Sequence, residues 1–360
     1  MEIHRTLPPK PLLAACVFLL LSGAVFTLES QDEQEIREIL STCMDQVREH
    51  YTDRECDQFD RMCREYGPAM VSYVEEYVAD PCSRVRWHAY VLLWRMGLDA
   101  NDLQVRQKIV TGLLMGVRDD AYNTGHLSHW LLQFSSADFS EPSRELVREM
   151  LVRALADANT NPREDIILLA GVADLKSELP RLKRFMDARE VILKERNEKH
   201  VQEWREAIGR LPDTNNMPAF LPRRKRYEKQ LMKQYWQSSL LWAALRARAR
   251  MGVKEDIARC IELVESHPDE DYRVAWLLEE LSYVRQPEIV DYLYRYLKSE
   301  KVRESKGPDT VVGTYAQHAA KALAQMLRGF PGRKDIGGDK ETIELRRKWM
   351  AEQKDWDIIR

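Results

Sequence analysis

The chain has 360 residues, of which 44% are apolar and 31% are charged, and only 15 are glycine. This composition favours helices, because straight-chain side chains lose little rotamer freedom there, and no alternating segment bounded by Asn-Gly or Asp-Gly predicts a strand. The 55 basic and 58 acidic residues leave a net charge of −3. That balance argues against a nucleic-acid-binding protein, since such proteins carry a basic excess that displaces counterions from phosphates.

The N-terminal segment has the composition of an export signal. Arg5 and Lys10 precede an uncharged apolar run, 12–21, and three small residues follow it. A positive start, an apolar stretch and a small-residue site together are typical of a secretory signal peptide. We therefore expect cleavage after Ala24, which removes residues 1–24.

Two alternatives keep this segment attached to the protein. The apolar stretch can be extended to residue 28, which brings it to the lower limit for a membrane-spanning anchor. Residues 13–16 also resemble a bacterial lipoprotein signal, although the apolar run before Cys16 is short. All three interpretations place the rest of the chain outside the cytoplasm, either secreted or periplasmic, or anchored to the membrane by this segment alone.

Five cysteines remain after the predicted signal: Cys43, Cys56, Cys63, Cys82 and Cys260. An oxidising compartment would permit disulfides. Cys56 and Cys63 cannot pair within one straight helix, because seven residues rise about 10.5 Å. If the chain turns near residue 52, Cys43 and Cys63 come to similar heights on antiparallel helices and form a candidate disulfide. The alternative is that all five are small buried apolar side chains.

Between residues 67 and 180 the sequence predicts three successive helix pairs. The first pair is divided at Asp80-Pro81, since proline lacks a donor and disfavours helix just before it, and it ends at Gly97. Asp102 is placed to cap the next helix, and Ser140 opens the third pair. Apolar residues recur at three- and four-residue steps within each predicted helix, as the buried face of an amphipathic helix requires.

A long charged segment interrupts this pattern. Apolar residues at helical spacing predict one long helix over about 177–210 and a second over about 223–251, joined by a proline-containing loop, 211–222. Two further helix pairs follow, over 257–281 and 289–327. A final charged helix with apolar residues at intervals is expected to cap the last pair.

The repeated unit resembles a known family. A single helix pair cannot bury its apolar stripe alone, whereas stacked pairs share one core. The spacing of roughly 40 residues, the turn residue between helices and the Val85-Arg86 and Val105-Arg106 pairs that open helices resemble HEAT repeats of the armadillo-like class. The resemblance implies an all-α fold, an α-solenoid of stacked antiparallel helix pairs, and a surface that binds partners.

The expected organisation follows from these segments. The signal or anchor covers residues 1–24, and the N-terminal repeats cover 31–180. A long helical hairpin insertion covers 181–252. The C-terminal repeats cover 253–330, and a terminal capping helix covers 339–360.

The loop of the insertion is the sequence's candidate partner-binding site. An apolar tip lies beside a basic cluster, and such a combination could dock a partner or an anionic surface. The residues are Met217, Phe220, Leu221, Arg223, Arg224, Lys225 and Arg226. The alternative is that the apolar residues fold back onto the repeats while the basic residues are solvated.

No arrangement of residues specifies a reaction. His126 and His129 have a spacing seen in zinc sites but lack an evident third ligand, and Cys82 with His88 lacks an orienting third residue. No glycine-rich phosphate loop or Gly-x-Ser-x-Gly elbow occurs. We therefore expect no catalytic, metal or cofactor site.

The tryptophans have two interpretations. Trp87 and Trp94 are seven residues apart and so share a helix face. Aromatic platforms can bind sugars or peptides, but packing between helices is the commoner use. The sequence thus favours a non-enzymatic scaffold for an unidentified protein partner. The alternative is an enzyme or enzyme accessory subunit whose concave groove holds a small ligand or polysaccharide.

Overall fold

The computed structural model describes residues 31–49, 54–119, 124–157, 162–209, 239–267, 270, 273–302, 313–332, 339–353 and 355–359. Within these residues the regular secondary structure is helical, apart from the isolated β-bridges Val302–Thr314 and Leu327–Ile358. The prediction of an all-α chain is confirmed for this part of the sequence. None of the described helices has both the length and the apolar composition needed to cross a membrane. The predicted signal segment lies outside the described residues.

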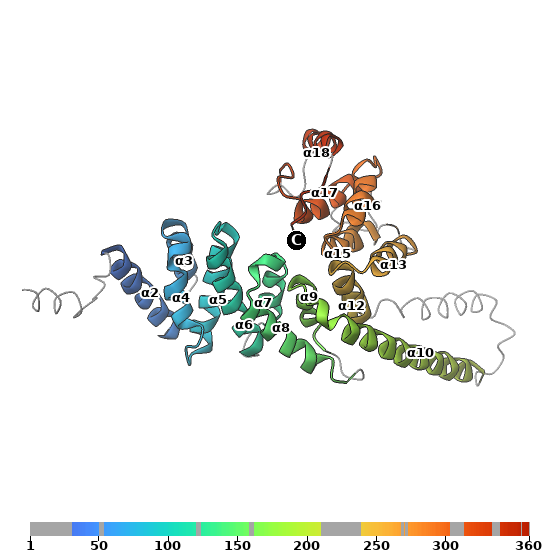
Figure 1. Ribbon diagram of the computed structural model, residues 1–360, viewed down its shortest axis with the longest axis horizontal. Coiled ribbons are helices and arrows are strands. Elements are labelled where there is room, and N and C mark those ends of the chain that lie inside the picture. The colour runs from blue at the N-terminus through green and yellow to red at the C-terminus, as the bar shows by residue number, and fades with distance from the viewer. Residues whose placement is uncertain are drawn as a thin grey trace, which may run out of the picture.

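The N-terminal helices lie side by side in a row (Figure 1). They are α2 (Gln31–Glu49), α3 (Arg54–Glu65), α4 (Val71–Val74), α5 (Ser83–Asp99), α6 (Leu103–Asp119), α7 (Thr124–Leu131), α8 (Glu141–Ala154) and α9 (Glu164–Val172). Helix α6 contacts α5, α7 and α8, while α9 contacts both α7 and α8. Helix α2 contacts α3 and also α5, so the helices of this part pack against α-helices up to three positions away in the sequence.

The C-terminal helices rise from the end of this row and produce a bend (Figure 1). They are α12 (Ser239–Arg250), α13 (Lys254–Glu265), the π-helical turn η6 (Arg273–Leu277), α15 (Leu278–Ser282), α16 (Pro287–Leu297), α17 (Tyr315–Met326) and α18 (Lys340–Glu352). Helix α17 contacts α15, α16 and α18. The long helix α10 (Leu179–Gly209) points away from both groups.

Several helices begin at the caps that the sequence offers. The Asp102 carboxylate accepts hydrogen bonds from the backbone N–H groups of Gln104 at 2.7 Å and Val105 at 3.1 Å. Ser140 is the N-cap of α8, with a proline in the first turn. These side chains satisfy donors that have no partner inside the helix. The predicted starts at Asp102 and Ser140 are therefore confirmed.

The two end helices are amphipathic. Helix α2 buries one stripe and exposes its polar face; the buried residues are Ile36, Leu40, Cys43, Met44 and Val47. Helix α18 contacts α16 and α17, and the segment after it is tied down, because the backbone N–H of Ile359 donates to Met326 O at 2.8 Å. Both ends of the described core are thus covered by a helix with a solvated outer side.

The insertion begins at α10, whose first three turns belong to the core. Leu182, Phe185 and Met186 are buried, whereas the described side chains from Lys194 onward are exposed. The sequence places residues 239–250 in the second helix of the hairpin. Residues 239–250 are helical as predicted and form α12, which packs against α9, α10 and α13; the earlier part of the predicted second helix lies outside the described residues.

The α9–α12 contact depends on small residues. A Cβ added at Gly171 would lie 2.9 Å from Ala247 Cα and 3.0 Å from Ala247 O. Real Cβ atoms do not approach backbone atoms so closely, and neither atom can rotate away. The two helices can therefore approach this closely only because Gly171 has no side chain.

We predict that Gly171→Ala destabilises the protein by about 1–3 kcal/mol, because overpacking against a backbone outweighs the gain of about 1 kcal/mol in helix propensity. Urea unfolding followed by circular dichroism measures the change. The control is Gly112→Ala, whose new Cβ would meet the mobile end of Leu93, Cδ1, at 2.7 Å, so its loss should be smaller. An unchanged or higher midpoint for Gly171→Ala would show that α9 and α12 are not packed this closely.

Candidate interaction surface

Three tryptophans from two helices form one stack. The Trp130 ring of α7 lies 5.4 Å from Trp87 at an interplanar angle of 29° and 4.6 Å from Trp94 at 11°, measured between ring centroids. Trp87 and Trp94 are separated by seven residues of α5, a rise of about 10.5 Å, which leaves room for one ring. Trp130 therefore lies between them. The predicted shared face of Trp87 and Trp94 is confirmed.

This stack lies at the edge of the core. All three tryptophans are half-buried and pack against buried apolar residues. His126 is exposed, and its ring centroid lies 6.2 Å from that of Trp87 and 6.5 Å from that of Trp130. The surface of α5 and α7 thus combines aromatic edges with an exposed imidazole.

The other two candidate histidines differ in exposure. His129 is exposed on α7. His88 is buried, with Nδ1 2.9 Å from Arg84 O of its own helix and its ring 5.5 Å from Phe59. Among the described residues, no three His, Cys, Asp or Glu side chains are grouped closely enough to hold a metal ion.

A second cluster joins α9, α12 and α15 around Arg246. Its guanidinium Nη2 donates to Glu164 Oε1 at 2.9 Å, and Nη1 lies 3.8 Å from Glu280 Oε2. The guanidinium also lies 5.1 Å from the centre of the Trp242 ring, while Trp242 Nε1 donates to the Glu280 carboxylate. One arginine therefore holds together side chains from three helices.

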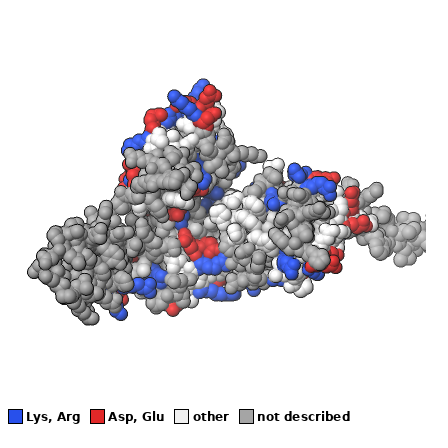
Figure 2. Space-filling view, turned by 180° about the vertical axis from the view of Figure 1, so that it is seen from behind, with Lys and Arg blue, Asp and Glu red and all other residues white. Residues whose placement is uncertain are grey.

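The positive and negative groups of this cluster differ in how far they are buried. The Arg246 side chain is 6% exposed, whereas those of Glu164 and Glu280 are 36% and 42% exposed. Figure 2 shows acidic side chains gathered at the foot of the C-terminal helices, with basic side chains directly below them and an uncharged surface beside them. The positive charge is buried, and the negative charges face solvent.

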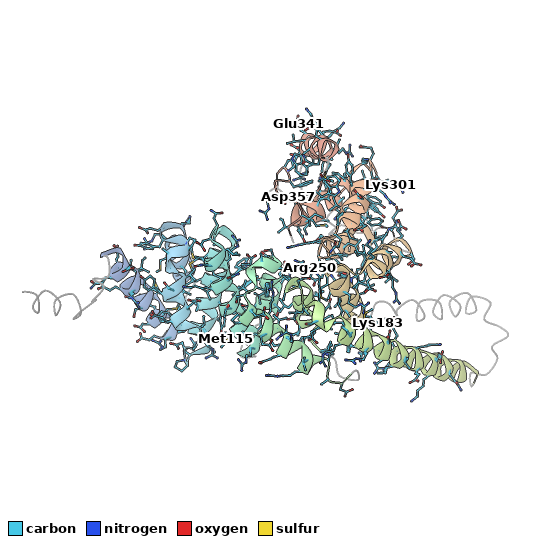
Figure 3. All side chains as sticks on the ribbon, in the orientation of Figure 1. Met115, Lys183, Arg250, Lys301, Glu341 and Asp357 are labelled. Carbon is cyan, nitrogen blue, oxygen red and sulfur yellow. The ribbon has the colours of Figure 1, made fainter. Side chains whose placement is uncertain are left out.

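Tyr283 lies in the turn that follows α15, and its ring centre is 5.8 Å from the Arg246 guanidinium carbon. Its hydroxyl donates to Leu168 O in α9, and its backbone oxygen accepts from Arg250 Nη1 at 2.8 Å. The Arg250 guanidinium lies 4.9 Å from the centre of the Tyr283 ring, and Figure 3 places Arg250 at the bend between the two groups of helices. Burial lowers the pKa of Arg250 and raises the pKa of Tyr283 to about 12.

Arg285 connects the same turn to α7. Its Nη1 donates to Phe134 O at 3.2 Å and its Nη2 to Leu132 O at 3.5 Å, just beyond the end of α7. A cation at this position interacts favourably with the negative end of the helix dipole. Arg285 has a positive φ of 51°, a conformation that non-glycine residues rarely adopt. The tertiary contacts therefore hold its backbone in an unfavourable region.

The loop residues proposed from the sequence, Met217, Phe220, Leu221 and Arg223 to Arg226, lie outside the described residues. Cys43 is buried and Cys63 is half-buried, and the Cys43 Sγ atom lies 3.9 Å from Met62 Sδ. The two cysteines are not joined to each other in the structure. Their pairing on oxidation stays a prediction.

Sequence reasoning missed the Arg246 cluster. Arg246 and Glu164 are 82 residues apart, and no local pattern links them. One signal was present: arginines at 246, 248 and 250 occur in a helix that is otherwise mainly apolar. Three guanidinium groups within an apolar segment require tertiary hydrogen-bond acceptors, whether carboxylates or backbone carbonyl groups.

No protein-family model matches this chain, and a search of curated proteins finds no similar sequence.

We predict that Arg246→Ala destabilises the protein by about 2–3 kcal/mol, mainly because removal of this buried side chain leaves a cavity, while the two carboxylates stay in contact with solvent. Arg246→Lys should not restore stability, since one ammonium cannot form both contacts of the guanidinium fork. Thermal unfolding of both variants measures this. Full stability of the lysine variant would show that only the charge matters.

We predict that Tyr283 stays protonated in the folded protein well above pH 10. Its folded pKa of about 12 exceeds the ordinary value of 10.0, so the protonated form is favoured by folding. The resulting stabilisation is complete below pH 10 and is lost as the pH rises through about 12. Ultraviolet absorbance titration of the native protein and of Tyr283→Phe should differ by one late-titrating tyrosine. Identical titration curves would contradict this assignment.

Proposed function

We propose that this chain is an exported HEAT-like helical scaffold without catalytic activity, which binds a protein partner along helices α5, α7, α9 and α12. The repeated helix pairs of the sequence support the solenoid part of the proposal. It is further supported by contacts between successive members of this series: the tryptophan stack joins α5 to α7, and α9 packs against both α7 and α12. The export part rests on residues 1–24 alone.

The half-buried tryptophan stack is the observation that carries the binding role. Tryptophan and arginine dominate the binding energy of protein interfaces, because they offer large, rigid and partly apolar surfaces. Trp87, Trp94 and Trp130 are half-buried on adjacent helices, and Trp242 is half-buried on α12. A partner that crosses these helices would remove the remaining aromatic surface from water.

The stack also favours a protein partner over a polysaccharide. A sugar ring packs against an open aromatic face, whereas both faces of Trp130 are covered by Trp87 and Trp94. Only the outer faces and the edges of the stack are left for a ligand. Edges and mixed polar groups suit protein side chains better than a flat sugar ring.

Site-specific photo-crosslinking tests this proposal. A photoreactive amino acid is placed at His129, exposed on α7, or at Met115, which is 40% exposed on α6; Figure 3 shows Met115 on the side of the row away from the bend. Each variant is exposed to the exported proteins of its natural source. We expect a discrete crosslinked protein from position 129 and a much weaker product from position 115.

The outcomes separate the two candidate functions. Equal products from both positions would show that the α7 side is not a specific interface. Retention of the protein on an immobilised polysaccharide, weakened by Trp87→Ala, would instead support the alternative of a sugar-binding accessory subunit. The same crosslinking with Phe220→Ser and Leu221→Ser tests the insertion loop, and equal recovery would remove the loop from the interface.

A further inference from the structure

The C-terminal helices expose one tryptophan on an unusual turn. Trp276 is 62% exposed and belongs to the five-residue π-helical turn Arg273–Leu277 that leads into α15. Such turns are rare in proteins and occur frequently at functional sites. Among the described large apolar side chains, Trp276 is the most exposed. These two features occur at the same place.

The residues that follow Trp276 on this helix face are acidic. Glu279 and Glu280 come three and four residues later, in the first turn of α15, and both are half-buried. Val274, Leu278 and Leu281 are fully buried and define the opposite side. The outward side of η6 and α15 therefore presents an indole followed by two carboxylates.

Flanking helices hold both carboxylates in place. Glu280 accepts from Trp242 Nε1 on α12, and Glu279 accepts from Lys321 Nζ of α17 at 2.7 Å. Gln325 Nε2 lies 3.2 Å from the second oxygen of Glu279. The carboxylates are therefore fixed on either side of the α15 face and do not need to be ordered by a ligand.

The exposed charge of this surface is negative. The side chains of Glu164, Glu279 and Glu280 are 36%, 38% and 42% exposed. Among their cationic partners, Lys321 is 35% exposed and Arg246 only 6%. Three carboxylates thus face solvent against one accessible ammonium. This excess complements a cation, and an indole face adds attraction for one.

We propose that the face formed by Trp276, Glu279 and Glu280 binds a segment of a partner protein in which lysine or arginine lies beside apolar residues. The ammonium or guanidinium group packs against the indole and faces the carboxylates, while the apolar neighbours cover the remainder of Trp276. This inference rests on the proposed scaffold function and names the chemistry of its partner.

Peptide binding by the full exported chain tests the proposal. The probe is a synthetic amphipathic helix of lysine and leucine, and the control is the same peptide with glutamate in place of lysine. Fluorescence anisotropy of the labelled peptides gives the affinity. We expect binding of the lysine peptide only, weakened by added salt, and a loss of roughly tenfold for Trp276→Ala.

A matched variant controls for general surface effects. Leu345 is 56% exposed on α18, and Leu345→Ala should leave the affinity unchanged. Because Trp276 is so exposed, its replacement should also leave the unfolding midpoint unchanged. Equal affinity of Trp276→Ala and the unmodified chain, or equal binding of the glutamate peptide, would overturn the proposal. A change in the sedimentation coefficient of Trp276→Ala, with none in Leu345→Ala, would also overturn the proposal. It would show that a second copy of this chain covers the face in the unmodified protein.

The result is distinguishable from failure of the proposed interface at α5 and α7. Loss of the crosslink at His129 with intact Trp276-dependent peptide binding would overturn that interface and keep this site. A crosslink at His129 without Trp276-dependent peptide binding would support the scaffold function and overturn the proposal of a cationic partner segment.

Discussion

The close approach of α9 and α12 is the constraint on which the rest of the structure depends. Gly171 and Ala247 bring two backbones together where larger side chains could not fit. This contact joins the last N-terminal helix, α9, directly to the first C-terminal helix, α12, so that the core continues from one group of helices to the next. It also sets the position of Arg246, one residue before Ala247, next to Glu164 at the start of α9.

Charge is distributed unevenly between the interior of the bend and its surface. Arg250 and Arg285 are buried and donate to backbone carbonyl oxygens of Tyr283, Leu132 and Phe134. Carbonyl groups supply hydrogen bonds but no compensating charge. Arg248, also on α12, is paired with the buried Asp256 carboxylate at 2.6 Å. The carboxylates of Glu164 and Glu280 lie nearer to solvent, where water stabilises their ionised form. The bend thus has more buried cations than buried carboxylates, and the carboxylates of Glu164 and Glu280 lie at its surface.

Local features of the fold could be predicted from the sequence because their causes are local. Asp102 and Ser140 cap the helices that follow them, and the seven-residue spacing of Trp87 and Trp94 placed both on one face. The insertion of Trp130 between them could not be predicted, since it depends on how α5 and α7 are placed relative to each other. The role of Gly171 could not be predicted either. Within the sequence of α9 it is only a residue of low helix propensity, and its lack of a side chain matters because α12 packs against it.

The candidate surfaces were harder to predict than the helices for the same reason. The sequence predicted an ordinary helix pair over residues 257–281. The structure contains a π-helical turn that leaves Leu277 half-buried and Trp276 exposed. A π-turn shifts the phase of the residues along a helix, and nothing in the composition of the segment marks where such a shift occurs. The acidic neighbours were visible in the sequence, but the residues of α12 and α17 that hold them were not.

The link between Arg285 and the end of α7 has a consequence for biosynthesis. The carbonyl groups that Arg285 binds belong to residues about 150 positions earlier, with a separation of 151 for Phe134. A ribosome releases the N-terminal helices long before this arginine has been translated. Contacts of such separation form late and slowly. The nascent chain therefore lacks the hydrogen bonds from Arg285 to the residues after α7 until the C-terminal helices have emerged.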